Sequence, residues 1–206
     1  MTAEATKATR LWPFYVPPLL MGGYLLVKCL YVMLSRFSYP YELEWIESAM
    51  LQVTMRVVDG LPIYAPPSMD YVPPLYAPLY FYMSALAIKI VGAGLPALRW
   101  VSLLASWCTA GLVAYSIWQL TRSRLAVLLG VCFWGALYAV SATYYDVARV
   151  DSLWACFLTG SVAALISFYA NKKNIFLVLF VLCLLLSVFT KQTTLTVLPF
   201  FFLALW

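Results

Sequence analysis

The chain alternates between long apolar runs and short polar segments. Five runs approach or reach the roughly 20 residues that a helix needs to cross a hydrocarbon core, and a sixth, shorter run begins after them. They cover about 11–34, 97–120, 125–142, 152–170, 175–189 and a last stretch that starts near 194. The pattern predicts an all-α integral membrane protein, a single module over 1–206 built as a bundle of about six transmembrane helices.

Segment 75–91 is ambiguous, because a crossing there would make seven spans and reverse the side of every later loop. Pro78 and Pro96 bracket this segment, and Lys89 interrupts it. The uninterrupted apolar stretch is then too short to span a membrane. We therefore predict a juxtamembrane helix that lies in the interface.

Six crossings place the basic segments on one side of the membrane. The tail before the first run contains Lys7 and Arg10, and later turns read TRSR at 121–124 and NKKN at 171–174. The positive-inside rule then predicts that these turns and the N-terminus, an uncleaved signal anchor, are cytoplasmic. All carboxylates except Glu4 fall in two outer loops, at about 35–96 and 143–151, so we expect the chemistry on the outer face.

Composition narrows the chemistry further. The chain is 65% hydrophobic and 10% charged, and its net charge of +5 comes from cations scattered among apolar runs. We therefore expect membrane lipids, and no nucleic acid, as its surroundings. Because the sequence contains no His, acid–base chemistry must rest on carboxylates, Lys or Tyr. Each of the five cysteines falls in a different apolar run and is interpreted as a small hydrophobic residue.

The first outer loop begins with an amphipathic pattern. Ile46, Met50 and Val57 belong to an apolar stripe at helical spacing, which predicts a helix on the membrane surface. Glu44 and Glu47 at its start have a structural interpretation, as acids on a solvated face near the N-terminal turn.

A proline-rich segment follows at 61–78 and contains six prolines. Such a segment is stiff, because each proline ring fixes one backbone angle. Tyr64 and Tyr71 stand between the prolines. They could present ring faces to a sugar, or they could anchor the loop at the level of the headgroups.

The second outer loop reads YYDVARVD and holds Asp146, Arg149 and Asp151 within six residues. One interpretation is structural, with Asp151 as a helix cap and Arg149 as its ion-pair partner. A third outer turn, FTKQTT, adds Lys191 on the same side. Acidic loops that face fixed cations indicate a substrate with an anionic headgroup.

These segments carry a resemblance to a known family. The order of ELEW with the glycine and Tyr-Pro pattern after it, YYDVARVDSL and FTKQT resembles the GT-C superfamily of polytopic glycosyltransferases. It looks closest to bacterial members related to the protein mannosyltransferases and to the aminoarabinose transferase of lipid A. The resemblance implies an enzyme of the bacterial plasma membrane that transfers a sugar from a polyprenyl-phosphate donor to a lipid, glycan or protein acceptor outside.

The resemblance also implies roles for individual residues. Glu44 matches the family's catalytic base or acceptor-positioning carboxylate, with Glu42 as a close competitor. Asp146 and Asp151 match second-loop acids, which orient the substrate or, in metal-dependent members, help to bind a divalent cation such as Mg²⁺ or Mn²⁺. No other cofactor is implied.

Physical requirements of the reaction agree with this assignment. Inverting glycosyl transfer needs a carboxylate that accepts the proton of the acceptor and positive charge that stabilises the departing phosphate. Glu44 would meet the first need. Arg149 and Lys191, with Lys89 or Arg99 behind them, would meet the second.

Members of the family are longer than this sequence, and its last apolar stretch is too short to cross a bilayer. We therefore expect further protein segments or another chain to complete the bundle. The alternative is a non-catalytic structural subunit of a larger membrane complex, derived from such an enzyme. A lipid or sugar transporter is a third interpretation, but apart from Lys28 the runs lack the ionisable residues near the midplane that a transporter is expected to carry.

Overall fold

The chain folds into helices over the residues that the computed structural model describes, 3–205 for the backbone and 14–203 for the side chains. The elements are α1 (Ala3–Arg36), α2 (Glu47–Val58), α3 (Leu79–Val91), α4 (Leu95–Thr121), α5 (Arg124–Ala136), α6 (Val150–Asn171), α7 (Asn174–Thr190), a 3₁₀ turn η1 (Gln192–Thr196) and α8 (Leu198–Leu205). The described residues form no strand. The all-α prediction is therefore confirmed.

Three helices are long and apolar enough to cross a membrane: Phe14–Arg36 of α1, α4 and α6. Helices α3, α5 and α7 are also apolar, but they have only 13, 13 and 17 residues. The structure thus supports a helical membrane protein. The number of helices in the described chain that meet the length of a crossing is three rather than the predicted six.

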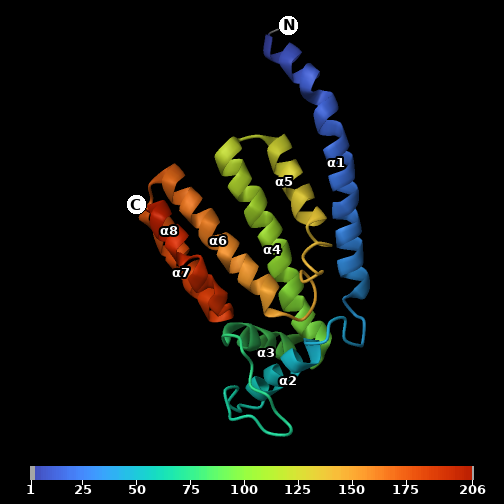
Figure 1. Cartoon of the computed structure of the whole chain (residues 1–206), viewed down its shortest axis with the longest axis vertical. Coiled ribbons are helices and arrows are strands. Elements are labelled where there is room, and N and C mark those ends of the chain that lie inside the picture. The colour runs from blue at the N-terminus through green and yellow to red at the C-terminus, as the bar shows by residue number, and fades with distance from the viewer. Residues whose placement is uncertain (1–2, 206) are drawn as a thin grey trace.

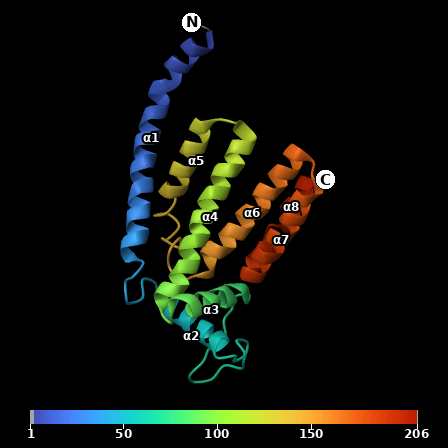
Figure 2. The same ribbon diagram turned by 180° about the vertical axis from the view of Figure 1, so that it is seen from behind.

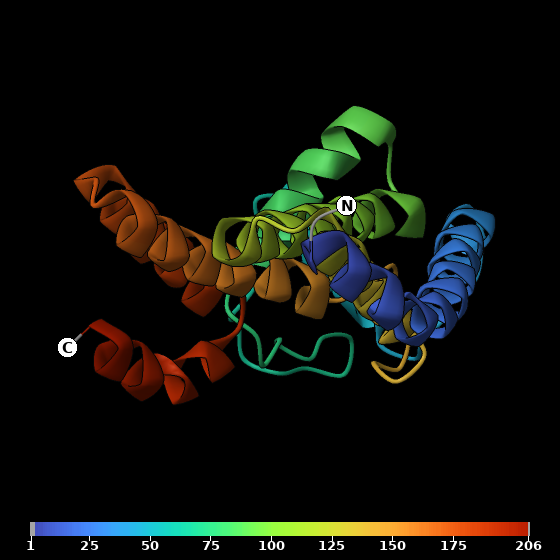
Figure 3. The ribbon, with the colours of Figure 1, turned by 90° about the horizontal axis from the view of Figure 1, so that it is seen from above.

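The long helices stand side by side in one row. Figures 1 and 2 show the order α1, α5, α4, α6, α7, and neighbours in this order contact one another. The turns after α4 and α6 lie at one end of the row, where Arg122 and Lys172 end their helices in the left-handed conformation, with φ of 52° and 54°. Helices α2 and α3 lie across the other end. Seen from above, α3 and the proline-rich loop lie on opposite sides of the row (Figure 3).

Helix α2 packs into the protein rather than onto a membrane surface. Met50 and Val53 of its apolar stripe are buried. They join Tyr80 and Phe81 of α3 and Leu98 of α4 in the largest core cluster of the described side chains. The predicted stripe is present, but the expected contact with the membrane is wrong, because α3 and the start of α4 already cover the stripe.

Helix α3 is short and lies across the end of the row (Figure 1), as predicted for segment 75–91. Pro78 precedes its first turn, and Gly92 ends it with φ of 102°, a value that favours glycine. Leu86 and Ile90 on its outer side are exposed. An apolar outer side at this level suits the interface between a membrane and water.

The third predicted span ends early. The apolar run 125–142 predicts one helix, but α5 stops at Ala136 and irregular turns continue through 137–149, here called the α5–α6 loop. Ala142 and Thr143 have φ of 52° and 59°, angles that residues other than glycine rarely adopt. A conformation of this kind persists only where its surroundings hold it.

Neighbouring side chains supply the hydrogen bonds that the α5–α6 loop lacks. The Ser106 hydroxyl donates to the Tyr145 carbonyl at 2.5 Å, and the Ser152 hydroxyl donates to the Tyr144 carbonyl at 2.7 Å. Arg36 at the end of α1 donates to a third carbonyl of this loop at 3.1 Å. The helix can end early because α1, α4 and α6 satisfy the backbone groups that a helix would have paired.

Glycine allows α1 and α5 to approach closely. A Cβ on Gly135 of α5 would lie 2.8 Å from the Cα of Leu26, and a Cβ on Gly22 of α1 would lie 2.7 Å from the Cβ of Cys132. Both obstacles are fixed by the backbone, so neither can move aside cheaply. Small residues at helix contacts are the usual means by which membrane helices pack together.

Gly135→Ala is expected to lower the free energy of unfolding by about 1–3 kcal/mol, because overpacking forces α1 and α5 apart. Gly23→Ala is the matched control, since a Cβ at Gly23 meets nothing within 4 Å and alanine is the better helix former. Unfolding of both variants in the same detergent or nanodisc measures the difference. Equal stability of the two variants would contradict the glycine contact.

Candidate functional site

A fully buried ion pair joins the start of α2 to the start of α4. Arg99 donates from Nε to Oε1 of Glu47 at 3.0 Å and from Nη2 to Oε2 at 2.6 Å, and both side chains are 0% exposed. Arg99 also donates to the carbonyls of Tyr39 and Tyr41 at 2.5 and 2.8 Å. These carbonyls lie in the segment 37–46, the α1–α2 loop. Charges removed from water need hydrogen bonding of this completeness.

Glu47 also holds two backbone N–H groups. Its Oε1 accepts from Ala148 in the α5–α6 loop and its Oε2 accepts from Leu43 in the α1–α2 loop, both at 2.7 Å. Burial opposes the charged form, but the hydrogen bonds from Arg99 and from these N–H groups outweigh it and keep the pKa of Glu47 below its ordinary value. The ion pair therefore fixes the two loops against each other.

Next to this pair, four charged side chains form a row of alternating sign. Nη1 of Arg149 donates to Oε1 of Glu44 at 2.9 Å, and Nε of Arg149 donates to Oδ2 of Asp151 at 2.9 Å. Nζ of Lys191 donates to Oδ1 of Asp151 at 2.6 Å. The four side chains are 11–21% exposed, so small molecules can reach them. We call Glu44, Arg149, Asp151 and Lys191 the charged row.

Aromatic rings flank the cations of the charged row. The guanidinium of Arg149 lies 4.2 Å from the centroid of the Tyr144 ring, and the ammonium of Lys191 lies 5.5 Å from that of Trp154. The indole N–H of Trp154 donates to the Thr194 hydroxyl at 2.8 Å, which fixes the plane of this ring. Cation–π contacts hold both cations where the helices α6 and α7 meet the loops.

Asp146 lies in a different ion pair. Nε and Nη2 of Arg36 donate to its two oxygens at 2.6 Å each, and the Tyr138 hydroxyl donates to Oδ1 at 3.0 Å. Asp146 is buried, with 2% of its surface exposed. The second-loop carboxylate that joins the cations Arg149 and Lys191 is thus that of Asp151.

The surroundings of Asp146 do not fit a divalent cation. Both of its oxygens accept hydrogen bonds from the Arg36 guanidinium, which an ion would have to displace. Over the described residues, no group of three or more His, Cys, Asp or Glu side chains is placed to hold a metal ion. The arrangement suits an ion pair that ties the end of α1 to the α5–α6 loop.

Three other residues predicted for the site lie outside the charged row. Arg99 is fully buried in its pair with Glu47 and presents no exposed atom to a substrate. Oε1 of Glu42 accepts from the N–H of Ser48 at 3.1 Å, at the exposed start of α2. Lys89 is exposed on the last turn of α3.

Tyr64 and Tyr71 hold the proline-rich loop in shape. The hydroxyl of Tyr71 donates to the Ile63 carbonyl at 2.5 Å, and its buried ring lies 4.0 Å beneath the Arg56 guanidinium. The hydroxyl of Tyr64 donates to the Tyr76 carbonyl at 2.8 Å, while its ring is 56% exposed. Both hydroxyls are therefore used within the loop.

Glu47 is the residue whose importance the sequence interpretation missed. The sequence pattern predicts an acid on a solvated face, but Glu47 is buried together with Met50 and Thr54, at i, i+3 and i+7 on α2. That spacing is the signal that could have placed it on the inner face. No local pattern connects Arg36 with Asp146, because the two are 110 residues apart in sequence.

A small cavity lies behind Asp151. It has a volume of about 220 Å³ and lies between α4, the end of α5, the α5–α6 loop and the start of α6. Four aromatic rings, four hydroxyl side chains, Ala155 and Asp151 line it. We call it the Asp151 cavity.

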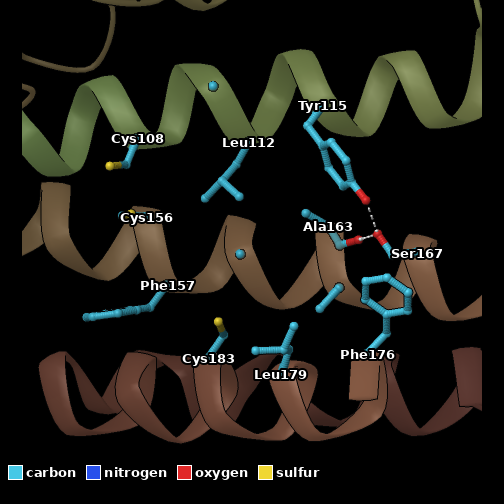
Figure 4. Close-up of a pocket in the computed structure, with 13 residues that line it drawn as sticks. Cys108, Leu112, Tyr115, Cys156, Phe157, Ala163, Ser167, Phe176, Leu179 and Cys183 are labelled. Carbon is cyan, nitrogen blue, oxygen red and sulfur yellow. Dashed lines mark hydrogen bonds between the residues drawn. The ribbon is translucent and has the colours of Figure 1, made fainter. Parts of the chain in front are cut away.

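A larger cavity of about 620 Å³ lies deeper in the row, between α4, α6 and α7 (Figure 4). Cys108, Cys156 and Cys183 approach it from these three helices, and the hydroxyls of Tyr115 and Ser167 contact each other at 2.8 Å on its wall. None of its lining residues is charged. It is an apolar space, and its lining residues Cys156 and Cys183 lie more than one helical turn along α6 and α7 from Asp151 and Lys191.

The chain matches no protein-family model, no curated protein and no solved structure.

Glu47→Gln is expected to lower the free energy of unfolding by about 3–5 kcal/mol, because it leaves Arg99 charged and unpaired in the interior. Asp59→Asn is the control, since Asp59 is an exposed carboxylate at the other end of α2, and a surface change of this kind costs no more than about 0.5 kcal/mol. Denaturant or thermal unfolding in nanodiscs compares the variants. A loss for Glu47→Gln as small as that for Asp59→Asn would mean that the pair does not organise this end of the molecule.

Proposed function

We propose that this protein transfers a sugar from a polyprenyl-phosphate donor to a lipid, glycan or protein acceptor, and that the charged row is the reaction site. One observation carries the proposal. Each of the three motifs that resemble the GT-C superfamily contributes at least one residue to the charged row. ELEW contains Glu44, YYDVARVDSL contains Arg149 and Asp151, and FTKQT contains Lys191. Segments far apart in sequence thus bring together a carboxylate and two cations.

In the proposed topology six segments cross the membrane: α1, α4, α5, α6, α7 and the stretch that contains α8. The basic turns at one end of the row would lie in the cytoplasm of a bacterium, and the charged row would lie at the outer face of its plasma membrane. Support comes from the separation of charge, since Arg122 and Lys172 lie at the opposite end of the row of helices from α2 and α3 (Figure 1).

The proposed reaction is an inverting displacement. The acceptor hydroxyl attacks the anomeric carbon of the sugar on the face opposite the phosphate, and its proton passes to Glu44. The bond between the anomeric carbon and the phosphate oxygen breaks, and its electron pair leaves with the polyprenyl phosphate. Arg149 and Lys191 stabilise the second negative charge that this phosphate gains.

Donor binding would also rearrange the ion pairs of the charged row. Nη1 of Arg149 donates to Oε1 of Glu44 at 2.9 Å, so this oxygen is occupied while the pair persists. A donor phosphate competes with Glu44 and Asp151 for the two cations. Once Arg149 turns to the phosphate, Glu44 is free to accept the proton of the acceptor. No step of this proposal runs through a metal ion at Asp146.

A structural subunit of a larger membrane complex is the second candidate. It is favoured because cations of this chain already neutralise the four acids Glu44, Glu47, Asp146 and Asp151. Such a protein would need the ion pairs only for folding. Neutral substitutions in the charged row that preserve folding then separate the two candidates, because they should reduce sugar transfer only if the protein is an enzyme.

Labelling of single cysteines tests the topology, in a background that lacks the five native cysteines. Ser123→Cys, in the turn between α4 and α5, is expected to react only with a membrane-permeant maleimide. Ser68→Cys, in the exposed proline-rich loop, is expected to react with an impermeant maleimide applied from outside. Outside labelling at position 123 would overturn the six-crossing arrangement and the outer location of the charged row.

Glu44→Gln is expected to reduce sugar transfer by about 10²–10⁴-fold while donor binding and folding persist, because it removes the base and keeps the volume. Glu42→Gln is the matched control, since Glu42 lies outside the charged row and accepts from the N–H of Ser48 at the exposed start of α2, and it should cost far less. Arg149→Ala should weaken donor binding as well as transfer. The assay is transfer from a polyprenyl-phosphate sugar in membranes that contain the protein, and wild-type turnover by Glu44→Gln would eliminate Glu44 as the base.

A further inference from the structure

The walls of the Asp151 cavity are flat aromatic rings, each of which is held in place by a contact with a neighbouring side chain. Trp134 stacks on Tyr145 with centroids 4.8 Å apart, Trp154 donates to Thr194, and Tyr144 lies beneath the Arg149 guanidinium. A ring that is already fixed loses little entropy when a ligand packs against it. Rigid aromatic faces suit ligands that present flat apolar C–H surfaces, as pyranose rings do.

Hydroxyl groups complete the lining. Ser106, Thr109 and Ser152 donate their protons to backbone carbonyls at 2.5–2.8 Å. A hydroxyl that donates in this way keeps lone pairs with which it can accept a hydrogen bond. The cavity therefore combines apolar faces with acceptors, a combination that suits a ligand with several O–H donors.

Asp151 connects this cavity with the charged row. Its two oxygens accept from Arg149 and Lys191, and the same residue lines the cavity. A phosphate held by these two cations would lie beside the Asp151 wall. The group attached to that phosphate then has the cavity next to it.

Volume and charge restrict what fits. The cavity of about 220 Å³ is smaller than the roughly 300–1,000 Å³ of sites for drug-sized ligands. Asp151 is the only charged residue in its lining, and two cations neutralise it. Among the described side chains, those that line the larger apolar cavity between α4, α6 and α7 (Figure 4) include no charged group that could hold a phosphate.

We infer that the Asp151 cavity binds a single uncharged sugar ring of the donor, with the aromatic walls against its C–H faces. The inference rests on the proposed function, and it names the part of the donor that this cavity selects. A sugar acid is excluded because the lining offers its carboxylate no free cation. A disaccharide exceeds the space.

The test compares equilibrium binding of three probes to the protein in nanodiscs: a short-chain prenyl phosphate, the same prenyl phosphate carrying one neutral hexose, and the same compound carrying a hexuronic acid. The wild type is expected to bind the hexose compound at least about tenfold more tightly than the bare prenyl phosphate. The hexuronic compound should show no such gain.

Two substitutions fill the cavity from different sides, Ala155→Leu on α6 and Ser141→Leu on the α5–α6 loop. Each is expected to abolish the gain from the hexose and to leave binding of the bare prenyl phosphate unchanged, which also reports correct folding. Ala170→Leu is the control, because Ala170 lies on the same helix, is exposed and does not line the cavity. It should bind all three probes as the wild type does.

The outcomes separate this inference from the proposed function. If the bare prenyl phosphate and the hexose compound bind equally, or if the gain survives both cavity-filling substitutions, the cavity is not the sugar site, although the charged row still binds prenyl phosphate. An equal gain from the hexuronic acid would overturn the selection for an uncharged ring. If no prenyl phosphate binds at all, the proposed function fails and this inference fails with it.

Discussion

Glu47 and Arg99 place two opposite charges where water does not reach, and the end of the molecule that carries the charged row is arranged around them. Taking an ion out of water costs several kcal/mol, so both side chains must be saturated with hydrogen bonds. The groups that saturate them belong to two irregular loops, through Tyr39, Tyr41 and the N–H groups of Leu43 and Ala148. Glu44 and Arg149 each follow one of these N–H groups in sequence, so their meeting is a consequence of the buried pair.

Burial separates two uses of the same chemistry. The core pair is 0% exposed and cannot exchange its partners, so it acts as a fixed joint. The four side chains of the charged row are 11–21% exposed, and under the proposed function a phosphate replaces the carboxylates as the partner of their cations. Asp146 is 3% exposed although its partner Arg36 is 21% exposed, so this carboxylate lies near the buried extreme. Exposure, more than the identity of the residues, decides which ion pair can take part in chemistry.

The apolar pattern predicts the long helices well, since burial in a membrane or a core imposes a continuous run of apolar residues. The predicted runs 97–120, 152–170 and 175–189 lie within two residues of the ends of α4, α6 and α7. The end of α5 could not be predicted in the same way. Ser106 and Ser152, which satisfy the α5–α6 loop, lie on other helices, so the composition of the run 125–142 contains no sign of them.

The charged row was predictable in part. Loop membership alone indicated that Glu44, Arg149, Asp151 and Lys191 belong to one face, and the structure brings these four into contact. The individual partners depend on distances in space. The sequence predicts Arg99 near a substrate, but no local pattern reveals that Arg99 pairs with Glu47 on the inner face of α2 and is buried there. The spacing of Glu47 with Met50 and Thr54 places this acid on the buried face of α2. Because acids are seldom fully buried, the pattern alone favours the solvated interpretation.

The early end of α5 has a consequence for the bilayer around it. Its 13 residues rise about 20 Å, some 10 Å less than a typical hydrocarbon core. Backbone carbonyls of Tyr144 and Tyr145, with the serines that bond them, occupy the missing length. In the proposed topology α5 crosses the bilayer with a helix shorter than the hydrocarbon core, and a bilayer responds to a short segment by thinning beside it. A headgroup at this point would then lie closer to the midplane than its neighbours, and under the proposed function a lipid-linked phosphate would travel a shorter distance to reach Arg149.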